Sequence, residues 1–283
     1  IIRKIVFFHS FLFIKIRGLL NRLVFNNFKH KLQNSIKIIH WGYFLNKPLP
    51  HNKYFADIHL TDSLSVERTN KYYKKNICLN LLSKDFEPTT FYNDLFEEDF
   101  KWDIINVCHN ARRKKINDFL EIVRRSLNKN PNLTSLLIVN SPGSKYRKNN
   151  PSISINFLRK YYKLFNYKER QQIVLLRISD ELGIEGVSFS FIKWAMLNSK
   201  IFLFTSIKEG AAKVVTEAHN ANCFILLRES LKGGTRDNLE KNKLYFWKNK
   251  EDAVEKIIQL TKTKKQLKKT FINEIAVKNL EFF

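Results

Sequence analysis

Glycine and proline are scarce in this sequence, with 8 glycines and 6 prolines among 283 residues. This composition argues against a collagen-like or low-complexity chain, and it favours compact helices and strands joined by short loops. Hydrophobic residues make up 44% of the chain and aromatic residues 13%, which is enough for a packed core and argues against disorder. Because a domain typically has roughly 100–200 residues, the length predicts two domains.

Cysteine is also scarce, and its three copies, Cys78, Cys108 and Cys223, lie far apart in the sequence. A disulfide framework or a zinc site requires paired, closely spaced cysteines. The sequence therefore predicts free thiols in a reducing cytoplasm. It shows no spacing of metal ligands, so we expect no metal site.

The apolar run at residues 5–14 resembles a signal peptide only superficially. It is too short to span a bilayer, it lacks a small-residue cleavage site, and Lys15 and Arg17 follow it at once. The chain also lacks an initiator methionine. We therefore interpret the sequence as the interior of a longer protein whose upstream portion is absent.

Acidic residues are fewer than basic ones: the chain has 26 aspartates and glutamates and 50 lysines and arginines, which gives a formal net charge of +24 at pH 7. A basic surface attracts nucleic acid, anionic lipid headgroups or phosphorylated ligands. The basic clusters at 112–115, 145–148 and 262–269 are short and dispersed, and the whole chain is rich in Lys, Asn and Ile. We therefore expect nucleic acid not to be the main partner, although a basic nucleic-acid-binding protein remains an alternative.

Short apolar runs alternate with longer amphipathic ones, which is typical of a parallel α/β architecture. We expect strands at 5–8, 35–40, 55–60, 76–81, 103–108, 135–139, 172–178, 201–205 and 223–228. We expect helices at 11–31, 115–127, 152–165, 187–199, 211–222, 250–265 and 266–283. The acidic, irregular segment 84–101 is interpreted as a linker.

Two glutamates, Glu209 and Glu217, are separated by seven residues between an apolar strand and a helix. Parallel sheets bind ligands at the carboxyl ends of their strands, where helix N-termini present free N–H groups to phosphates. Gly210 permits close backbone approach, and the small Ala211 and Ala212 leave the helix N-terminus open. Glu217 is expected about two turns into the helix. The alternative is an ordinary strand–helix unit with two unrelated glutamates.

The run 199–228 resembles the C-terminal domain of retaining GT-B glycosyltransferases of the large family 4. Those enzymes carry, after a buried strand, Pro-Ser, then Glu-Gly-Phe-Gly, then Glu-Ala, another strand and Gly-Gly. The corresponding residues here are Thr205-Ser206, Glu209-Gly210, Glu217-Ala218 and Gly233-Gly234. Upstream, 104–107 matches the family's first strand, Lys114 its phosphate-binding lysine, and 136–143 its second strand and turn.

This resemblance implies two Rossmann-like domains with parallel sheets. Residues 1–95 would form an incomplete acceptor-side domain, 96–265 the nucleotide-sugar domain, and 266–283 a C-terminal helix. The implied activity moves a sugar from a nucleoside diphosphate sugar to a saccharide or lipid-linked acceptor, with retention and no further cofactor, in polysaccharide or glycan synthesis. It would take place in the cytoplasm, where the basic stretch 15–31 would meet anionic membrane headgroups. A non-catalytic relative or fragment is the alternative.

The resemblance also implies roles for single residues. Glu209 would contact the donor sugar and Glu217 the ribose, while the backbone at Gly210, Ala211 and Ala212 would line the sugar and diphosphate. Lys114 would neutralise the departing diphosphate.

Some positions depart from the family pattern. The family's Gly-Arg after the first strand reads Cys108-His109, so Arg112 or Arg113 would replace that arginine, and His109 is a further candidate for phosphate contact. Arg228 and Lys232 lie near Gly233-Gly234 and could reach the nucleotide, but they are interpreted as solvated surface charges.

His40 is the candidate on the acceptor side, because relatives place a strand-end histidine opposite the donor sugar. The alternative for His40 is a polar strand-end residue next to Trp41 and solvent.

Overall fold

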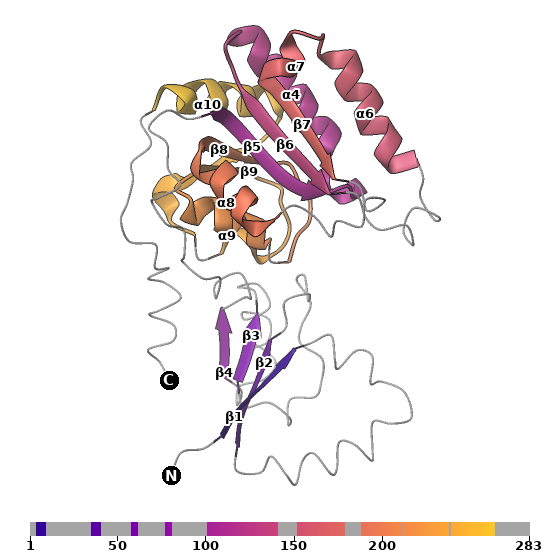
Figure 1. Cartoon of the computed structure of the whole chain (residues 1–283). Helices are drawn as coiled ribbons and strands as arrows, with labels where there is room; N and C mark the ends of the chain where they lie inside the picture. Colours follow the sequence, from indigo (N-terminus) through magenta and orange to yellow (C-terminus); the bar gives the residue numbers. More distant parts are fainter. Residues whose placement is uncertain are drawn as a thin grey trace.

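The computed structural model describes residues 4–9, 35–40, 58–61, 77–80, 101–140, 152–178, 188–210, 212–237 and 239–263. These residues form two all-parallel β-sheets, one with four strands and one with six (Figure 1). The predicted α/β class is confirmed. The predicted linker up to residue 100, the domain boundary after residue 95, and the helices at 11–31 and 266–283 lie outside the described residues.

The four-stranded sheet has the order β1-β2-β3-β4. Its strands are β1 (Lys4–His9), β2 (Ser35–His40), β3 (Ile58–Thr61) and β4 (Ile77–Asn80). The register pairs His9 with His40, so that β1 and β2 end together on a histidine each.

The six-stranded sheet has the order β10-β9-β8-β5-β6-β7. Its strands are β5 (Trp102–His109), β6 (Ser135–Asn140), β7 (Ile173–Ile178), β8 (Ser199–Phe204), β9 (Phe224–Arg228) and β10 (Leu244–Trp247). The helices are α4 (Ile116–Lys129), α6 (Ser152–Leu164), α7 (Glu169–Gln172), α8 (Phe189–Leu197), α9 (Lys213–Asn220) and α10 (Lys250–Lys262). Single 3-10 turns are η3 (Arg112–Lys114), η5 (Gly234–Arg236) and η6 (Lys241–Lys243).

Both faces of the six-stranded sheet are covered by helices (Figure 1). On one face, α4, α6 and α10 pack over a core that includes Ile104, and on the other α8 and α9 pack over a core that includes Ile105. Successive strand residues point to opposite faces, and both isoleucines are fully buried. This two-sided burial explains why the strands read as continuous apolar runs and do not alternate with polar residues.

The strand order creates a switch point between β5 and β8. The chain moves from β5 outward to β6 and β7, then returns to β8 on the other side of β5 and continues to β9 and β10. At such a point the connections from the two neighbouring strands diverge to opposite faces, which opens a crevice beyond the carboxyl ends of the strands. The segments that follow β5 and β8 are therefore where this fold binds a ligand.

Helix α10 begins with a side-chain cap. The Asn249 side chain accepts a hydrogen bond from the Asp252 N–H at 2.9 Å, which satisfies one of the free donors of the first turn. We expect Asn249→Ala to lower the free energy of unfolding by about 1 kcal/mol, measured by urea denaturation. Asn249→Asp keeps the cap and is expected to retain nearly all of that stability; an equal loss in both variants would refute the capping role.

Candidate functional site

The segments after β5 and β8 are tied together by two hydrogen bonds. The Thr205 hydroxyl donates to the Lys114 carbonyl at 2.8 Å, and the Ile207 N–H donates to the Arg113 carbonyl at 3.1 Å. Thr205 is fully buried, so the first of these bonds is shielded from water. The turn η3 is thereby held against the loop that carries Glu209.

Glu209 lies between two cations at this point. Its Oε1 atom is 2.6 Å from Lys114 Nζ and 3.1 Å from Arg113 Nε. The side chains of Lys114 and Glu209 are only 8% and 12% exposed, whereas that of Arg113 is 55% exposed. The Lys114–Glu209 pair is therefore the stronger interaction, because water screens the arginine. The structure thus brings together three of the residues that the sequence singled out: Glu209, Lys114 and Arg113.

Cys108 lies in β5 close to this ion pair. Burial raises the pKa of its thiol to about 12, with Lys114 lowering it and Glu209 raising it further. Cys108 therefore stays protonated at neutral pH and does not act as a nucleophile. The Lys114 ammonium is also 5.5 Å from the ring centroid of Phe204, so the lysine side chain packs against an aromatic ring.

The loop of Glu209 is supported by the segment after β9. The Glu209 N–H donates to the Lys232 carbonyl at 2.9 Å, and the Thr235 hydroxyl donates to the Glu209 carbonyl at 3.3 Å. Gly233 has a φ of 107°, which residues with a Cβ avoid, and it lets the chain turn into η5. The Gly-Gly turn thus holds the backbone of the glutamate in place.

Helix α9 begins later than predicted, at Lys213. Ala212 is extended because its N–H is donated to the Thr235 hydroxyl at 3.3 Å. Glu217 therefore lies little more than one turn into the helix, and the expectation of two turns is wrong. Ala212 is buried, and Gly210 and Glu217 are half-buried, while Ala211 lies outside the described residues.

The two predicted histidines lie at strand ends. His109 ends β5 and is exposed, and His40 ends β2, with its side chain outside the described part of the chain. Of the two alternative arginines, Arg113 contacts Glu209. Arg228 differs from expectation because it is not a solvated charge: it pairs with Asp118 at 2.5 Å and lies 4.3 Å from the Trp247 ring centroid.

Within the described ranges, no group of three or more His, Cys, Asp and Glu side chains is arranged to hold a metal ion. None of the described helices is long and apolar enough to cross a membrane.

No protein-family model matches the sequence, and no curated protein matches it. Solved structures do match. The chain is similar to a TarM variant from S. aureus bound to fondaparinux, α-GlcNAc-glycerol and UDP, with 14% identity and a TM-score of 0.55 over 90% of this chain and 48% of that one. It is similar to the pneumococcal O-GlcNAc transferase GtfA bound to UDP and GlcNAc, with 11% identity and a TM-score of 0.52 over 90% of this chain and 50% of that one.

A third similar structure is an α,α-trehalose-phosphate synthase (UDP-forming) from Burkholderia vietnamiensis. It shares 11% identity and a TM-score of 0.58 over 93% of this chain and 67% of that one. The chain thus spans about half the length of TarM and GtfA. At these identities the likeness establishes the fold, which is of the GT-B type with parallel Rossmann-like sheets.

Proposed function

We propose that this chain is part of a glycosyltransferase that takes its sugar from a nucleoside diphosphate sugar, bound where β5 and β8 end. The observation that carries the proposal is the pairing of Lys114 and Arg113 with one oxygen of Glu209 at the switch point. Two cations and a carboxylate at this position suit a ligand that has both phosphates and hydroxyls. The similar folds of TarM and GtfA, both solved with UDP, support it.

In this proposal, a bound diphosphate replaces Glu209 as the partner of Lys114 and Arg113. A bound diphosphate would attract Lys114 and Arg113 away from Glu209, because a phosphate offers more charge and more acceptor oxygens than one carboxylate. The released Glu209 would then accept hydrogen bonds from hydroxyls of the donor sugar. As the bond between sugar and diphosphate breaks, Lys114 would stabilise the negative charge that develops on the leaving group.

The surrounding residues complete the proposed donor site. The backbone from Gly210 to the start of α9 would line the sugar and diphosphate, because a helix N-terminus favours a phosphate. Glu217 in α9 would accept hydrogen bonds from the ribose hydroxyls, and His109 at the end of β5 would approach the phosphates. No cofactor beyond the donor is required in this scheme.

The acceptor is proposed to be a saccharide or a lipid-linked saccharide at the cytoplasmic face of a membrane, with His40 facing the donor sugar. We propose retention at the anomeric carbon, following the resemblance of the Glu209–Glu217 segment to retaining enzymes. The coupling constant of the anomeric proton in the product, measured by NMR, decides between retention and inversion.

The donor site is tested by thermal unfolding with UDP, GDP and ADP, each compared with its nucleoside. We expect at least one nucleoside diphosphate to raise the unfolding temperature and its nucleoside not to, because ligands that bind only the folded state stabilise it. Glu217→Ala is expected to reduce the shift through loss of the ribose contact, while Glu229→Ala, an exposed glutamate after β9, leaves it unchanged. The absence of any shift would refute the proposal.

A further inference from the structure

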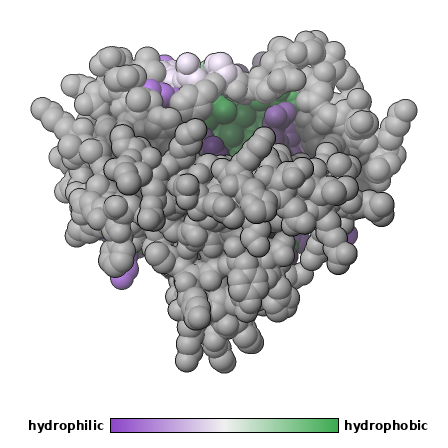
Figure 2. Space-filling view, turned by 90° about the horizontal axis from the view of Figure 1, so that it is seen from below, coloured by the Kyte–Doolittle hydropathy of each residue, from purple (hydrophilic) through white to green (hydrophobic). Residues whose placement is uncertain are grey.

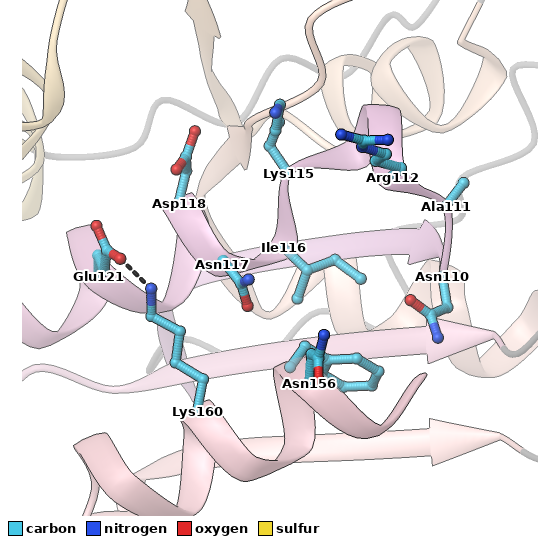
Figure 3. Close-up of a pocket in the computed structure, with 11 residues that line it drawn as sticks. Asn110, Ala111, Arg112, Lys115, Ile116, Asn117, Asp118, Glu121, Asn156 and Lys160 are labelled. Atoms are coloured by element: carbon cyan, nitrogen blue, oxygen red, sulfur yellow. Dashed lines mark hydrogen bonds and ion pairs between the residues drawn. The ribbon is translucent and has the colours of Figure 1, made fainter. Parts of the chain in front are cut away.

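A pocket of about 690 Å³ opens between the start of α4 and α6 (Figure 3). Neither Lys114 nor Glu209 lines it. Its polar side chains come from the end of β5, from η3 and from the two helices: Asn110, Arg112, Lys115, Asn117, Asn156 and Lys160. Among the described residues visible in the space-filling view of Figure 2, apolar and polar ones lie side by side.

Asn110 is the buried polar residue of this pocket. It is only 4% exposed, and its side-chain amide has no hydrogen-bond partner within the described residues. Its backbone N–H donates to the Asn140 carbonyl at 2.8 Å, which fixes the residue at the strand end. Figure 3 shows its amide directed toward Ile116 and Asn156. An amide at the wall of a pocket can donate hydrogen bonds to a ligand and accept them from it.

The N-terminus of α4 meets the same pocket. Lys115 precedes the 14-residue helix with a φ of 51° and provides no side-chain cap. The N–H groups of Ile116 and Asn117 have no acceptor within the described part of the chain. There, the Arg112 and Lys115 side chains also form no ion pair. Free N–H groups together with two free cations form a site for an anion.

Two acidic residues also line the pocket, and both are already neutralised. Asp118 pairs with Arg228 at 2.5 Å and with Lys250 at 3.3 Å. Glu121 pairs with Lys160 and Lys250. Burial opposes ionisation of Glu121, but the hydrogen bonds and charges of the two lysines lower its pKa overall, so it remains ionised. The charge left for a ligand is therefore positive.

We propose that this pocket binds a sugar phosphate, with the phosphate at the N-terminus of α4 between Arg112 and Lys115. The amide of Asn110 and the polar side chains across the pocket would hydrogen-bond to sugar hydroxyls. Ile116 and Phe157 provide an apolar wall against which the C–H face of a sugar packs. This site is separate from the donor site proposed above, because neither Lys114 nor Glu209 lines it.

Calorimetric titration of the full chain with glucose 6-phosphate, inorganic phosphate and glucose tests the proposal. We expect glucose 6-phosphate to bind, inorganic phosphate to bind more weakly, and glucose not to bind. Asn110→Asp is nearly isosteric and places a negative charge in the pocket, and Lys115→Asn removes the ammonium but tolerates the positive φ. Each is expected to weaken glucose 6-phosphate binding about tenfold or more. Lys115→Asn loses a charge-assisted hydrogen bond to the phosphate, and the carboxylate of Asn110→Asp repels the phosphate.

The matched control is Arg125→Ala, which removes an exposed cation from the same helix and is expected to leave affinity unchanged. Lys114→Met is likewise expected to leave glucose 6-phosphate binding unchanged, and the pocket variants to retain any thermal shift caused by UDP. The proposal is wrong if glucose 6-phosphate does not bind, if its binding survives both pocket variants, or if Lys114→Met abolishes it. None of these results depends on whether UDP binds.

Discussion

Lys114→Met is expected to reduce sugar transfer by about 100- to 1000-fold, the loss typical when one group that stabilises developing charge is removed. The methionine keeps the apolar stem against Phe204 but has no charge to offer the leaving diphosphate. Because this interaction strengthens as the bond breaks, the loss is expected mainly in kcat. The initial rate of sugar transfer is measured with the nucleotide sugar whose nucleoside diphosphate raises the unfolding temperature of the chain.

Two observations separate a catalytic effect of Lys114→Met from unfolding. Thr205 bonds to the backbone of residue 114, so η3 stays attached to the loop after β8, and Glu209 keeps Arg113 as a partner. The circular dichroism spectrum is therefore expected to match that of the wild type. Lys129→Met, at the exposed end of α4, serves as the control. A folded Lys114→Met protein with wild-type kcat would contradict the role of this lysine.

Glu209→Gln is expected to have opposite effects on binding and on transfer. The wild-type carboxylate competes with the diphosphate for Lys114 and Arg113, so its neutral isostere should let UDP, or whichever nucleoside diphosphate binds, bind about fivefold more tightly, equivalent to roughly 1 kcal/mol. Transfer should fall by about 100-fold, because the amide is a poorer acceptor for the sugar hydroxyls. Calorimetry measures the first effect and initial rates the second.

The control for Glu209→Gln is Glu229→Gln, which removes an exposed carboxylate without changing the switch point. If Glu209→Gln weakened nucleotide binding instead, the carboxylate would be a direct ligand of the nucleotide and not its competitor. That result would reverse the order of events proposed for the ion pair.

The location of Lys114 and Glu209 at one edge of the sheet was predictable from the sequence because each residue lies in the loop that follows a buried parallel strand. The carboxyl ends of such strands meet at one edge of a sheet, and the order of strands and helices along the chain indicates a doubly wound fold. The continuous apolar runs, such as 136–139 and 201–204, are also typical of strands in a sheet that is covered on both faces. These inferences use only local pattern and chain order.

The remaining features depend on contacts that no local pattern reveals. The start of α9 is decided by the Thr235 hydroxyl, which holds the Ala212 N–H outside the helix although alanine favours helices. Arg228 was misjudged because its partner, Asp118, is 110 residues away. Strand β10 was missed because four residues carry little periodic signal, and only pairing with β9 identifies them.

Lys114 and Lys115 are consecutive, yet one pairs with Glu209 and the other lines the pocket beside α4. One peptide unit thus joins two places where we propose that phosphates bind, and a displacement of η3 toward one ligand moves the backbone that faces the other. Thermodynamic linkage makes such an effect reciprocal: the factor by which a sugar phosphate changes the affinity for the donor nucleotide equals the factor by which that nucleotide changes the affinity for the sugar phosphate.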